Sequence, residues 1–243
     1  EIVGDFVRLI RTIRPDVILS LGPEGDGGGQ HHQASAIIAR EAFKAAADPT
    51  RFPEQIKGGL RAWQPRKFYS PSGRGNGPGT GPAPSGRTLA IDTAVYDQLL
   101  GRSYSEIGSE ARSMHKCQGT AQLLALPSPS TSTFQLVESS IAGQMQRDER
   151  TMFDNIDTSI TGLAQFAGAR PPRELNESLT LIATAIRTAQ LRFDDAGDQA
   201  TLTPLLTGLR NVRTTRGMLR GLQIDDAARY EIDFRLRQKE REF

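Results

Sequence analysis

Residues 14–33 read RPDVILSLGPEGDGGGQHHQ, and this stretch decides the fold. Its apolar run, 17–21, is short and nearly continuous, which is typical of a strand buried on both faces of a parallel sheet. A glycine-rich loop follows at 22–30, and an alanine-rich helical pattern extends from 31 to about 47. Apolar residues recur every three or four positions through 1–13, which predicts a helix before the strand. The sequence therefore predicts an α/β sheet, in which ligands bind at the carboxyl ends of the strands, where the glycine-rich loop lies.

The next hundred residues continue the α/β pattern. Further strands are predicted at 66–70 and 87–92, and the segment between them, 71–86, is so rich in Gly, Pro and Ser that it reads as a flexible insertion. Helical patterns follow at 96–100 and 104–118. A short helix is also expected after Pro53, and Ser103 with Glu106 three residues later has the spacing of a capping box.

The composition changes after residue 125. Residues 126–133 are rich in Ser, Pro and Thr and are interpreted as a linker, and residues 134–243 show helical periodicity with almost no strand signal. The expected helices cover about 155–167, 173–193, 200–220 and 225–242. The prediction is thus the carboxyl-terminal part of an α/β domain at 1–125, a linker, and an α-helical region.

Charge and composition exclude several classes of protein. There are 30 Lys plus Arg against 28 Asp plus Glu, and the acidic residues interleave with the basic ones, so no nucleic-acid partner is expected. The basic side chains of 61–74 are expected to lie at a solvated edge. No apolar run approaches the roughly 20 residues that span a bilayer. Cys117 is the single cysteine, which leaves the compartment unknown and is compatible with a periplasmic or extracellular location.

The chain has three histidines, His31, His32 and His115, and all three lie in segments that look functional. His31 and His32 stand between the glycine-rich loop and a helix, where a rigid strand supports an imidazole as a metal ligand. Neighbouring helical residues point about 100° apart, so the pair is not expected to bind one ion. The alternative is that one histidine caps the helix or bonds a loop carbonyl.

The glycine-rich loop has an alternative interpretation as a phosphate cradle before a helix. Its sequence matches neither the P-loop, which needs Lys and Ser or Thr, nor the GxGxxG pattern in the proper frame. Asp26 is interpreted as a residue that solvates the loop; the alternative is that it hydrogen-bonds a ligand residue of the site. A nucleotide- or phosphate-binding α/β domain therefore stays as a third hypothesis.

The order of residues 14–19, the glycine-rich loop, and His32 followed by Gln33 and Ala34 resembles the second metal-binding segment of the LmbE-like (PIG-L) zinc-dependent N-deacetylases. In that family a strand commonly precedes Gly-His-Pro-Asp-His. The resemblance implies that His32 is a zinc ligand. His31 falls where the family often has aspartate, and Gly29 where it often has a catalytic histidine, so His31 is suggested as the substitute in catalysis.

Further segments resemble the same family in the same order. They are 52–55, 63–69, 103–104 and 112–119. The last is similar to a late helix in which His-x-Ser-Gln is common, with Cys117 at the serine position. The resemblance implies that His115 lies near the mouth of the active site as a catalytic residue; the alternative is a helix histidine bonded to backbone or to Gln118. Cys117 is expected to be a small buried residue.

The resemblance implies a three-layer, Rossmann-like domain that removes an N-acetyl group from a glucosamine-like sugar or glycoconjugate with the help of zinc. In the family, two zinc ligands and a carboxylate base come from an early Ala-His-Pro-Asp-Asp-Glu motif, which these 243 residues do not contain. The parent protein is therefore expected to be the enzyme and this chain alone to be inactive. The alternative is a non-catalytic carbohydrate-binding or interaction module on the same scaffold.

Overall fold

The computed structural model describes residues 1–21, 29–72, 88–116, 128–196 and 198–243. They form two compact units, Glu1–Ile156 and Asp157–Phe243. The first unit mixes a sheet with helices and the second is helical, which confirms the predicted α/β class with a following helical region. The predictions for most of the glycine-rich loop, for nearly all of the insertion at 71–86, and for Asp26, Cys117 and Gln118 lie outside the described residues.

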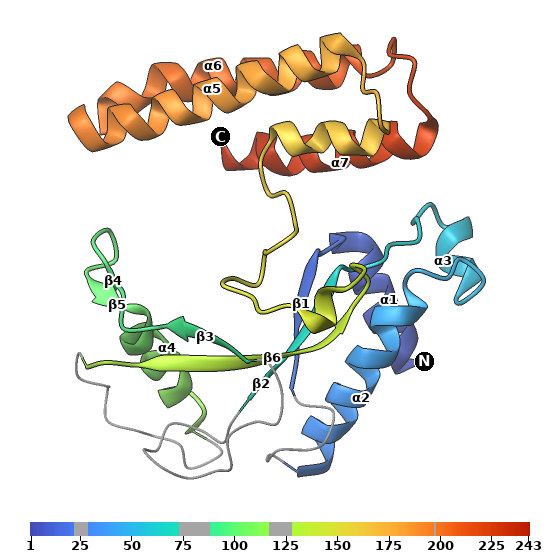
Figure 1. Ribbon diagram of the computed structural model, residues 1–243, viewed down its shortest axis with the longest axis vertical. Coiled ribbons are helices and arrows are strands. Elements are labelled where there is room, and N and C mark those ends of the chain that lie inside the picture. Colours follow the sequence, from blue (N-terminus) through green and yellow to red (C-terminus); the bar gives the residue numbers. More distant parts are fainter. Residues whose placement is uncertain (22–28, 73–87, 117–127, 197) are drawn as a thin grey trace. The chain divides into compact units, whose positions relative to one another are not determined.

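A four-stranded mixed sheet forms the centre of the first unit (Figure 1). Its order is β1 (Val17–Leu19), β2 (Lys67–Pro71), β6 (Thr131–Ser139) and β3 (Thr88–Asp92). β1 and β2 are parallel, with Leu19 opposite Tyr69, whereas β6 pairs antiparallel with both β2 and β3. The carboxyl ends of β1 and β2 therefore lie at the same edge of the sheet.

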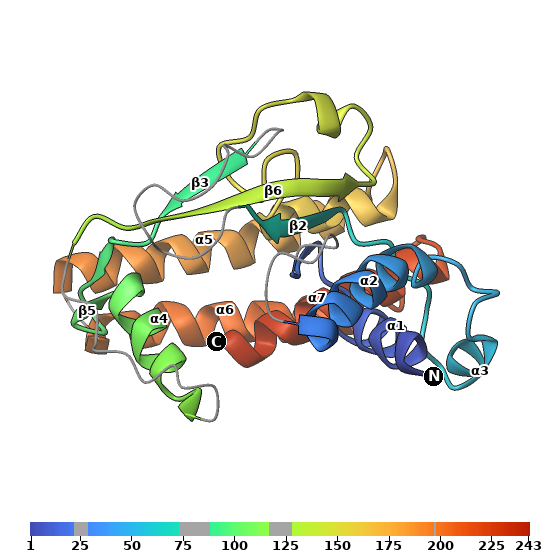
Figure 2. The same ribbon diagram turned by 90° about the horizontal axis from the view of Figure 1, so that it is seen from below.

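Two helices cover one face of this sheet, α1 (Ile2–Ile13) and α2 (Gly29–Ala45) (Figure 2). Ala39 and Phe43 of α2 pack on Phe68 of β2, and the rings of Phe43 and Phe68 meet edge to face with their centroids 5.8 Å apart. Side chains alternate between the faces of a strand. Lys67 and Tyr69, on either side of Phe68, therefore point to the opposite face.

The prediction that the strand at 17–21 is buried on both faces is wrong. β1 covers only Val17–Leu19, it lies at an edge of the described sheet, and the Leu19 side chain is 50% exposed. The apolar run is a genuine strand signal, but hydropathy does not distinguish a central strand from an edge strand, because their difference lies in how many neighbours pair with them.

A fully buried arginine joins α1 to the segment after α2. Gln55, in α3 (Pro53–Lys57), accepts a hydrogen bond from Arg11 at 3.1 Å and donates one to the Gly4 carbonyl at 2.8 Å. The Arg11 guanidinium also donates to five backbone carbonyls, those of Ala45, Ala46, Asp48, Arg51 and Phe52. Burial lowers the pKa of Arg11, and the carbonyls compensate for the lost water. The short helix expected after Pro53 is confirmed.

The region after β3 differs from its prediction. Residues 96–100 are not helical: Tyr96–Asp97 forms β4, which pairs with β5 (Arg102–Ser103) across a turn. Asp97 accepts hydrogen bonds from two turn N–H groups, and Gly101 has a φ of 67°, in the left-handed region that glycine adopts most easily. Local turn chemistry thus overrides the helical periodicity.

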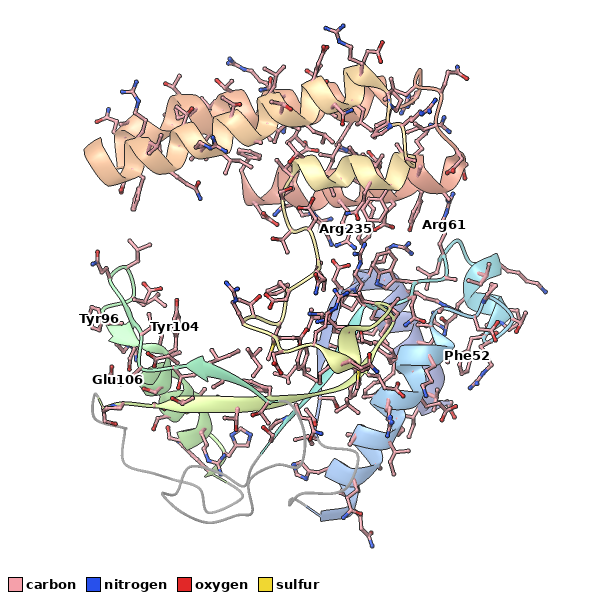
Figure 3. The ribbon with its side chains drawn as sticks, viewed as in Figure 1. Phe52, Arg61, Tyr96, Tyr104, Glu106 and Arg235 are labelled. Carbon is pink, nitrogen blue, oxygen red and sulfur yellow. The ribbon has the colours of Figure 1, made fainter. Side chains whose placement is uncertain are left out.

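α4 (Tyr104–Ser113) begins as predicted. The Ser103 side chain accepts from the N–H of Glu106, and the Glu106 carboxylate accepts from the N–H of Ser103. The hydrogen bonds that the Glu106 carboxylate accepts from the N–H and the hydroxyl of Ser103 lower its pKa. Figure 3 shows Glu106 beside Tyr96 and Tyr104 in this part of the chain. The capping box is confirmed, although the helix ends five residues before the predicted end at 118.

The predicted linker at 126–133 and the start of the helical region at 134 are both corrected by β6. This nine-residue strand, Thr131–Ser139, crosses the predicted boundary and lies between β2 and β3. Its Ser and Thr residues suggested a linker, but β-branched residues also favour strands, and two flanking strands supply the pairing. The division between the units lies at 156 and 157 instead.

The second unit contains α5 (Arg173–Ala196), α6 (Asp198–Met218) and α7 (Asp226–Glu242), close to the predicted 173–193, 200–220 and 225–242. The helix predicted at about 155–167 is instead a shorter 3-10 helix, η3 (Thr161–Ala167). Leu179, Val212 and Leu236 lie in one apolar core that all four elements share. Arg216 of α6 bonds Asp233 of α7 at 2.9 Å. In the part of the chain that the structure describes, no helix has the length and apolar character needed to cross a membrane.

Candidate functional site

The two neighbouring histidines lie in the first turn of α2. Gly29, at the start of this helix, has a φ of 76°. His31 and His32 are both exposed, and all of 29–35 is exposed as well, since α2 begins to bury side chains only at Ala36. The chain enters this turn from the carboxyl end of β1, so the imidazoles are accessible from solvent at the helix start where the sequence places a site.

His115 lies on a different element. It follows α4, its backbone N–H donates to the carbonyl of Arg112 at 3.0 Å, and its side chain is exposed. The helix-histidine alternative and the site alternative both fit an exposed ring just past a helix end. The roles predicted for His31, His32 and His115 stay predictions.

A catalytic zinc ion needs three protein ligands and keeps one position for water. Among the described residues, no group of three or more His, Cys, Asp or Glu side chains is arranged to hold a metal ion. His32 offers one suitable donor, but a single imidazole does not make a zinc site. The described part of the chain therefore does not complete the ligand set that the resemblance implies.

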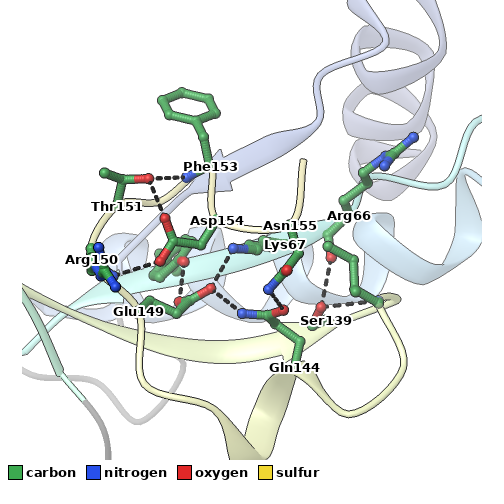
Figure 4. A network of polar contacts seen from close by, with 12 residues as sticks. Arg66, Lys67, Ser139, Gln144, Glu149, Arg150, Thr151, Phe153, Asp154 and Asn155 are labelled. Carbon is green, nitrogen blue, oxygen red and sulfur yellow. Dashed lines mark hydrogen bonds and ion pairs between the residues drawn. The ribbon is translucent and has the colours of Figure 1, made fainter. Parts of the chain in front are cut away.

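A second polar cluster, which we name the Glu149 cluster, lies on the opposite face of the sheet (Figure 4). It consists of Lys67, Tyr69, Gln144 and Glu149. Lys67, Tyr69 and Gln144 are buried completely, and the Glu149 side chain is only 6% exposed. The Glu149 carboxylate accepts from the Lys67 ammonium and from Gln144 Nε2, at 2.6 Å, through one oxygen, and from the Tyr69 hydroxyl through the other.

The segment that carries Glu149 is held down by further polar contacts. The side-chain Oε1 of Gln144 accepts a hydrogen bond from Asn155 Nδ2 at 2.8 Å. Asp154 accepts from the backbone N–H of Arg150 at 2.7 Å and from the Thr151 hydroxyl at 2.8 Å, and these bonds lower its pKa. The segment at 140–156, with its short helix η2 (Gln144–Gln146), thus forms an irregular cover over the face opposite α1 and α2.

Burial and the adjacent Glu149 carboxylate raise the pKa of Tyr69 far above its usual value. The phenol therefore stays protonated and donates a hydrogen bond to Glu149. Each oxygen of the buried carboxylate has a donor, and the buried ammonium has its counter-ion. The arrangement is that of a buried structural ion pair and not that of a catalytic base that is accessible to substrate.

This cluster was not predicted from the sequence. The expectation that the basic side chains of 61–74 lie at a solvated edge is wrong for Lys67, which is buried completely. A signal was present: alternation puts Lys67 and Tyr69 on the face opposite the apolar Phe68, so two polar-tipped residues share one face of a predicted strand. Their partner, Glu149, is about 80 residues away, and no local pattern points to it.

Comparisons with known proteins give a partial similarity. No family profile matches the chain. Over 103 residues, 42% of the chain, it is 34% identical to the mycothiol S-conjugate amidase of Streptomyces coelicolor. Over 69 residues, 28% of the chain, it is 33% identical to 1D-myo-inositol 2-acetamido-2-deoxy-alpha-D-glucopyranoside deacetylase 2 of Frankia casuarinae.

The chain matches 31% of the length of the first relative and 21% of the second. Both relatives are named as hydrolases of an amide bond, one in a mycothiol conjugate and the other in an acetamido sugar joined to inositol. Part of the chain is thus similar to an amidase and a deacetylase that act on sugar-like conjugates.

Proposed function

We propose that the chain is part of a hydrolase that removes an N-acetyl group from an amino-sugar-like conjugate. The observation that carries the proposal is the place of His32, whose exposed imidazole stands in the first turn of α2 after the carboxyl end of β1. Ligands of open α/β sheets bind at this end of the strands. The named activities of the two relatives support the same reaction class.

His32 is the residue that we assign to zinc. The two other protein ligands and the carboxylate base come, in this proposal, from residues outside these 243. A bound zinc ion would lower the pKa of its water and polarise the acetyl carbonyl. Among the residues that the structure describes, the proposal assigns one donor to zinc, so the chain alone is expected to be inactive.

His31 and His115 have separate roles in the proposal. His31 neighbours His32 but points about 100° away around the helix, so it is not expected to bind the same metal ion. We assign it to proton transfer. When the amide breaks, the departing amine nitrogen takes a proton, which a protonated imidazole can donate. His115 is assigned to the mouth of the site, where it contacts the sugar.

The test uses a longer polypeptide of the same protein that includes any segment preceding Glu1. Zinc content is measured by mass spectrometry, and acetate release from N-acetylglucosamine conjugates by a coupled assay. His32→Ala should remove both zinc and activity. The adjacent His31→Ala is the matched variant, and it should keep zinc while turnover falls by about 10² to 10⁴.

For each assignment there is an experimental result that would contradict it. Full zinc content in the His32→Ala protein rejects His32 as a ligand. Metal-dependent turnover by the 243 residues alone shows that the site is elsewhere. Sugar binding by the longer polypeptide with no acetate release, under conditions where zinc is bound, supports a carbohydrate-binding module in place of the enzyme.

A further inference from the structure

One apolar side of α1 is left exposed. Ile2, Phe6, Leu9 and Ile13 follow one another at intervals of four, three and four residues, so they share one side of the helix. We name this set the α1 stripe. Ile2, Leu9 and Ile13 are 60%, 55% and 50% exposed, whereas Val7, on another side of the same helix, is buried completely. The apolar surface of α1 is therefore wider than the part that the described residues cover.

The α1 stripe lies at the β1 edge of the sheet. Phe6, which belongs to the stripe, packs against the same apolar clusters as Ile18 of β1. Val7 packs in one cluster with Ala42 of α2, the helix that lies over β2. Leu9 points about 160° away from Val7 around α1, so the stripe turns away from α2 and toward the side of β1 that is remote from β2.

The same edge of the sheet presents backbone groups. The Ser20 N–H donates to the Tyr69 carbonyl at 3.0 Å, on the side where β1 pairs with β2. Backbone groups of successive strand residues alternate in direction, so those of Val17 and Leu19 point to the other side. Among the described strands, none lies on that side of β1. An open edge of this kind is a template for a further strand.

The connections between the elements indicate which segment occupies this edge. β1 leads through α2 to its parallel neighbour β2, and such connections are right-handed in about 98% of cases. α1 lies on the same face of the sheet as α2 and leads into β1 (Figure 2). A right-handed connection through α1 therefore starts from a parallel strand on the side of β1 away from β2, which is the open edge.

We propose that the α1 stripe and the open edge of β1 bind a parallel strand of the same protein that precedes α1 in the sequence. One face of this strand buries the α1 stripe, and its other face contacts the Leu19 side chain, which is exposed on the opposite side of the sheet. The occupant is apolar on both faces, as strands of parallel sheets are. The proposal does not rest on the proposed function, because it uses no reactive side chain.

Amide hydrogen exchange, followed by NMR, tests the pairing on the 243-residue chain and on the longer polypeptide. In the 243 residues, the Leu19 amide should exchange about 10²-fold faster than the Ser20 amide, which has Tyr69 as its acceptor. In the longer polypeptide the two rates should become similar, since the new strand supplies an acceptor to Leu19. An unchanged ratio of the two rates overturns the proposal. Close Hα–Hα contacts between β1 and the new strand show antiparallel pairing and also overturn it.

Leu9→Asp tests the apolar part of the surface. In the longer polypeptide it should lower Tm by about 5–15 °C, because it places a carboxylate beneath the new strand. In the 243-residue chain the shift should be less than about 2 °C, since Leu9 is exposed there. Leu181→Asp is the matched control, because Leu181 is 58% exposed on α5 in the other unit, and its effect should be small in both polypeptides.

Two results with these variants overturn the proposal. The first is an equally small Tm shift for Leu9→Asp and Leu181→Asp in the longer polypeptide. The second is an oligomer of the longer polypeptide that Leu9→Asp converts to a monomer in sedimentation, because the α1 stripe then binds a second copy. The zinc and acetate assays decide the proposed function separately: absence of hydrolysis, with the Leu19 amide protected, rejects the proposed function and leaves this surface assigned.

Discussion

The two faces of the sheet in the first unit carry polar groups in opposite settings. The first turn of α2 holds His31 and His32 in the open, with no buried side chain before Ala36. On the other face, the Glu149 cluster holds a carboxylate and an ammonium under a cover of chain, with every oxygen of the carboxylate hydrogen-bonded.

The difference separates groups that stabilise the fold from groups that are available for chemistry. A buried ion pair is expensive to break, because one charge is then left without solvent or partner. An exposed imidazole contributes little to stability and is accessible to a metal ion or a substrate. Substitutions in the Glu149 cluster should therefore lower stability more than function, and substitutions of the exposed histidines should lower function more than stability.

The largest expected effect is that of Glu149→Ala, which leaves the Lys67 ammonium buried without a counter-ion. We expect the free energy of unfolding to fall by about 3–5 kcal/mol, measured by urea denaturation. The neighbouring Asp148→Ala is the control and should change it by less than about 0.5 kcal/mol, since Asp148 is exposed. Equal effects of the two variants would show that Glu149 is as exposed as Asp148, which would contradict the difference between the two faces.

Tyr69→Phe should have a smaller effect, because it removes one of three donors to Glu149. The expected loss is about 1–2 kcal/mol at pH 7. The raised pKa of Tyr69 in the folded protein also sets a pH dependence. Above about pH 10 the phenol ionises in the unfolded chain but not in the folded one, so stability falls as pH rises, by up to about 1.4 kcal/mol per pH unit.

The same denaturation curves at several pH values measure this slope. The Tyr69→Phe protein lacks the phenol and should lose less stability between pH 10 and 11 than the unaltered protein does. Parallel curves for the two proteins in that range would show that Tyr69 titrates normally and is not held by Glu149.

Ser103→Ala tests a helix start of known geometry. Ser103 caps α4 and belongs to a capping box, so its loss should cost about 1 kcal/mol, again by urea denaturation. Ser103→Thr is the matched variant and should keep most of the stability, because threonine also accepts a hydrogen bond at this position. A neutral Ser103→Ala substitution would contradict the capping geometry.

The smallest stability effect is expected at the first turn of α2. His32→Ala should change the free energy of unfolding by less than about 0.5 kcal/mol, since the side chain is exposed. In the longer polypeptide the same substitution should remove zinc. A large loss of stability without metal would show that His32 holds the fold and would reverse the comparison between the two faces.

Local patterns predicted much of the secondary structure. The helix before β1, the capping box at Ser103 and the three long helices of the second unit, α5, α6 and α7, are present where periodicity and capping placed them. Errors arose where a local signal had two meanings. The Ser- and Thr-rich stretch was a strand and not a linker, and the helical periodicity of 96–100 gave way to a turn that Asp97 stabilises.

The candidate site was predicted in part. His31, His32 and His115 were identified from their residue type and their place beside a strand end or a helix end, which are local properties. The Glu149 cluster was not, because the segment at 140–156 brings Glu149 to β2 from about 80 positions away.

By itself, the sequence determined the class of the fold, the helix starts and the histidines at the start of α2, since each depends on residues close together in the chain. Only the tertiary structure decided that β6 lies between β2 and β3, that Lys67 is buried, and that Glu149 meets Lys67 and Tyr69. Pairing and burial depend on which distant segments meet, and hydrophobic packing of the whole unit sets that choice.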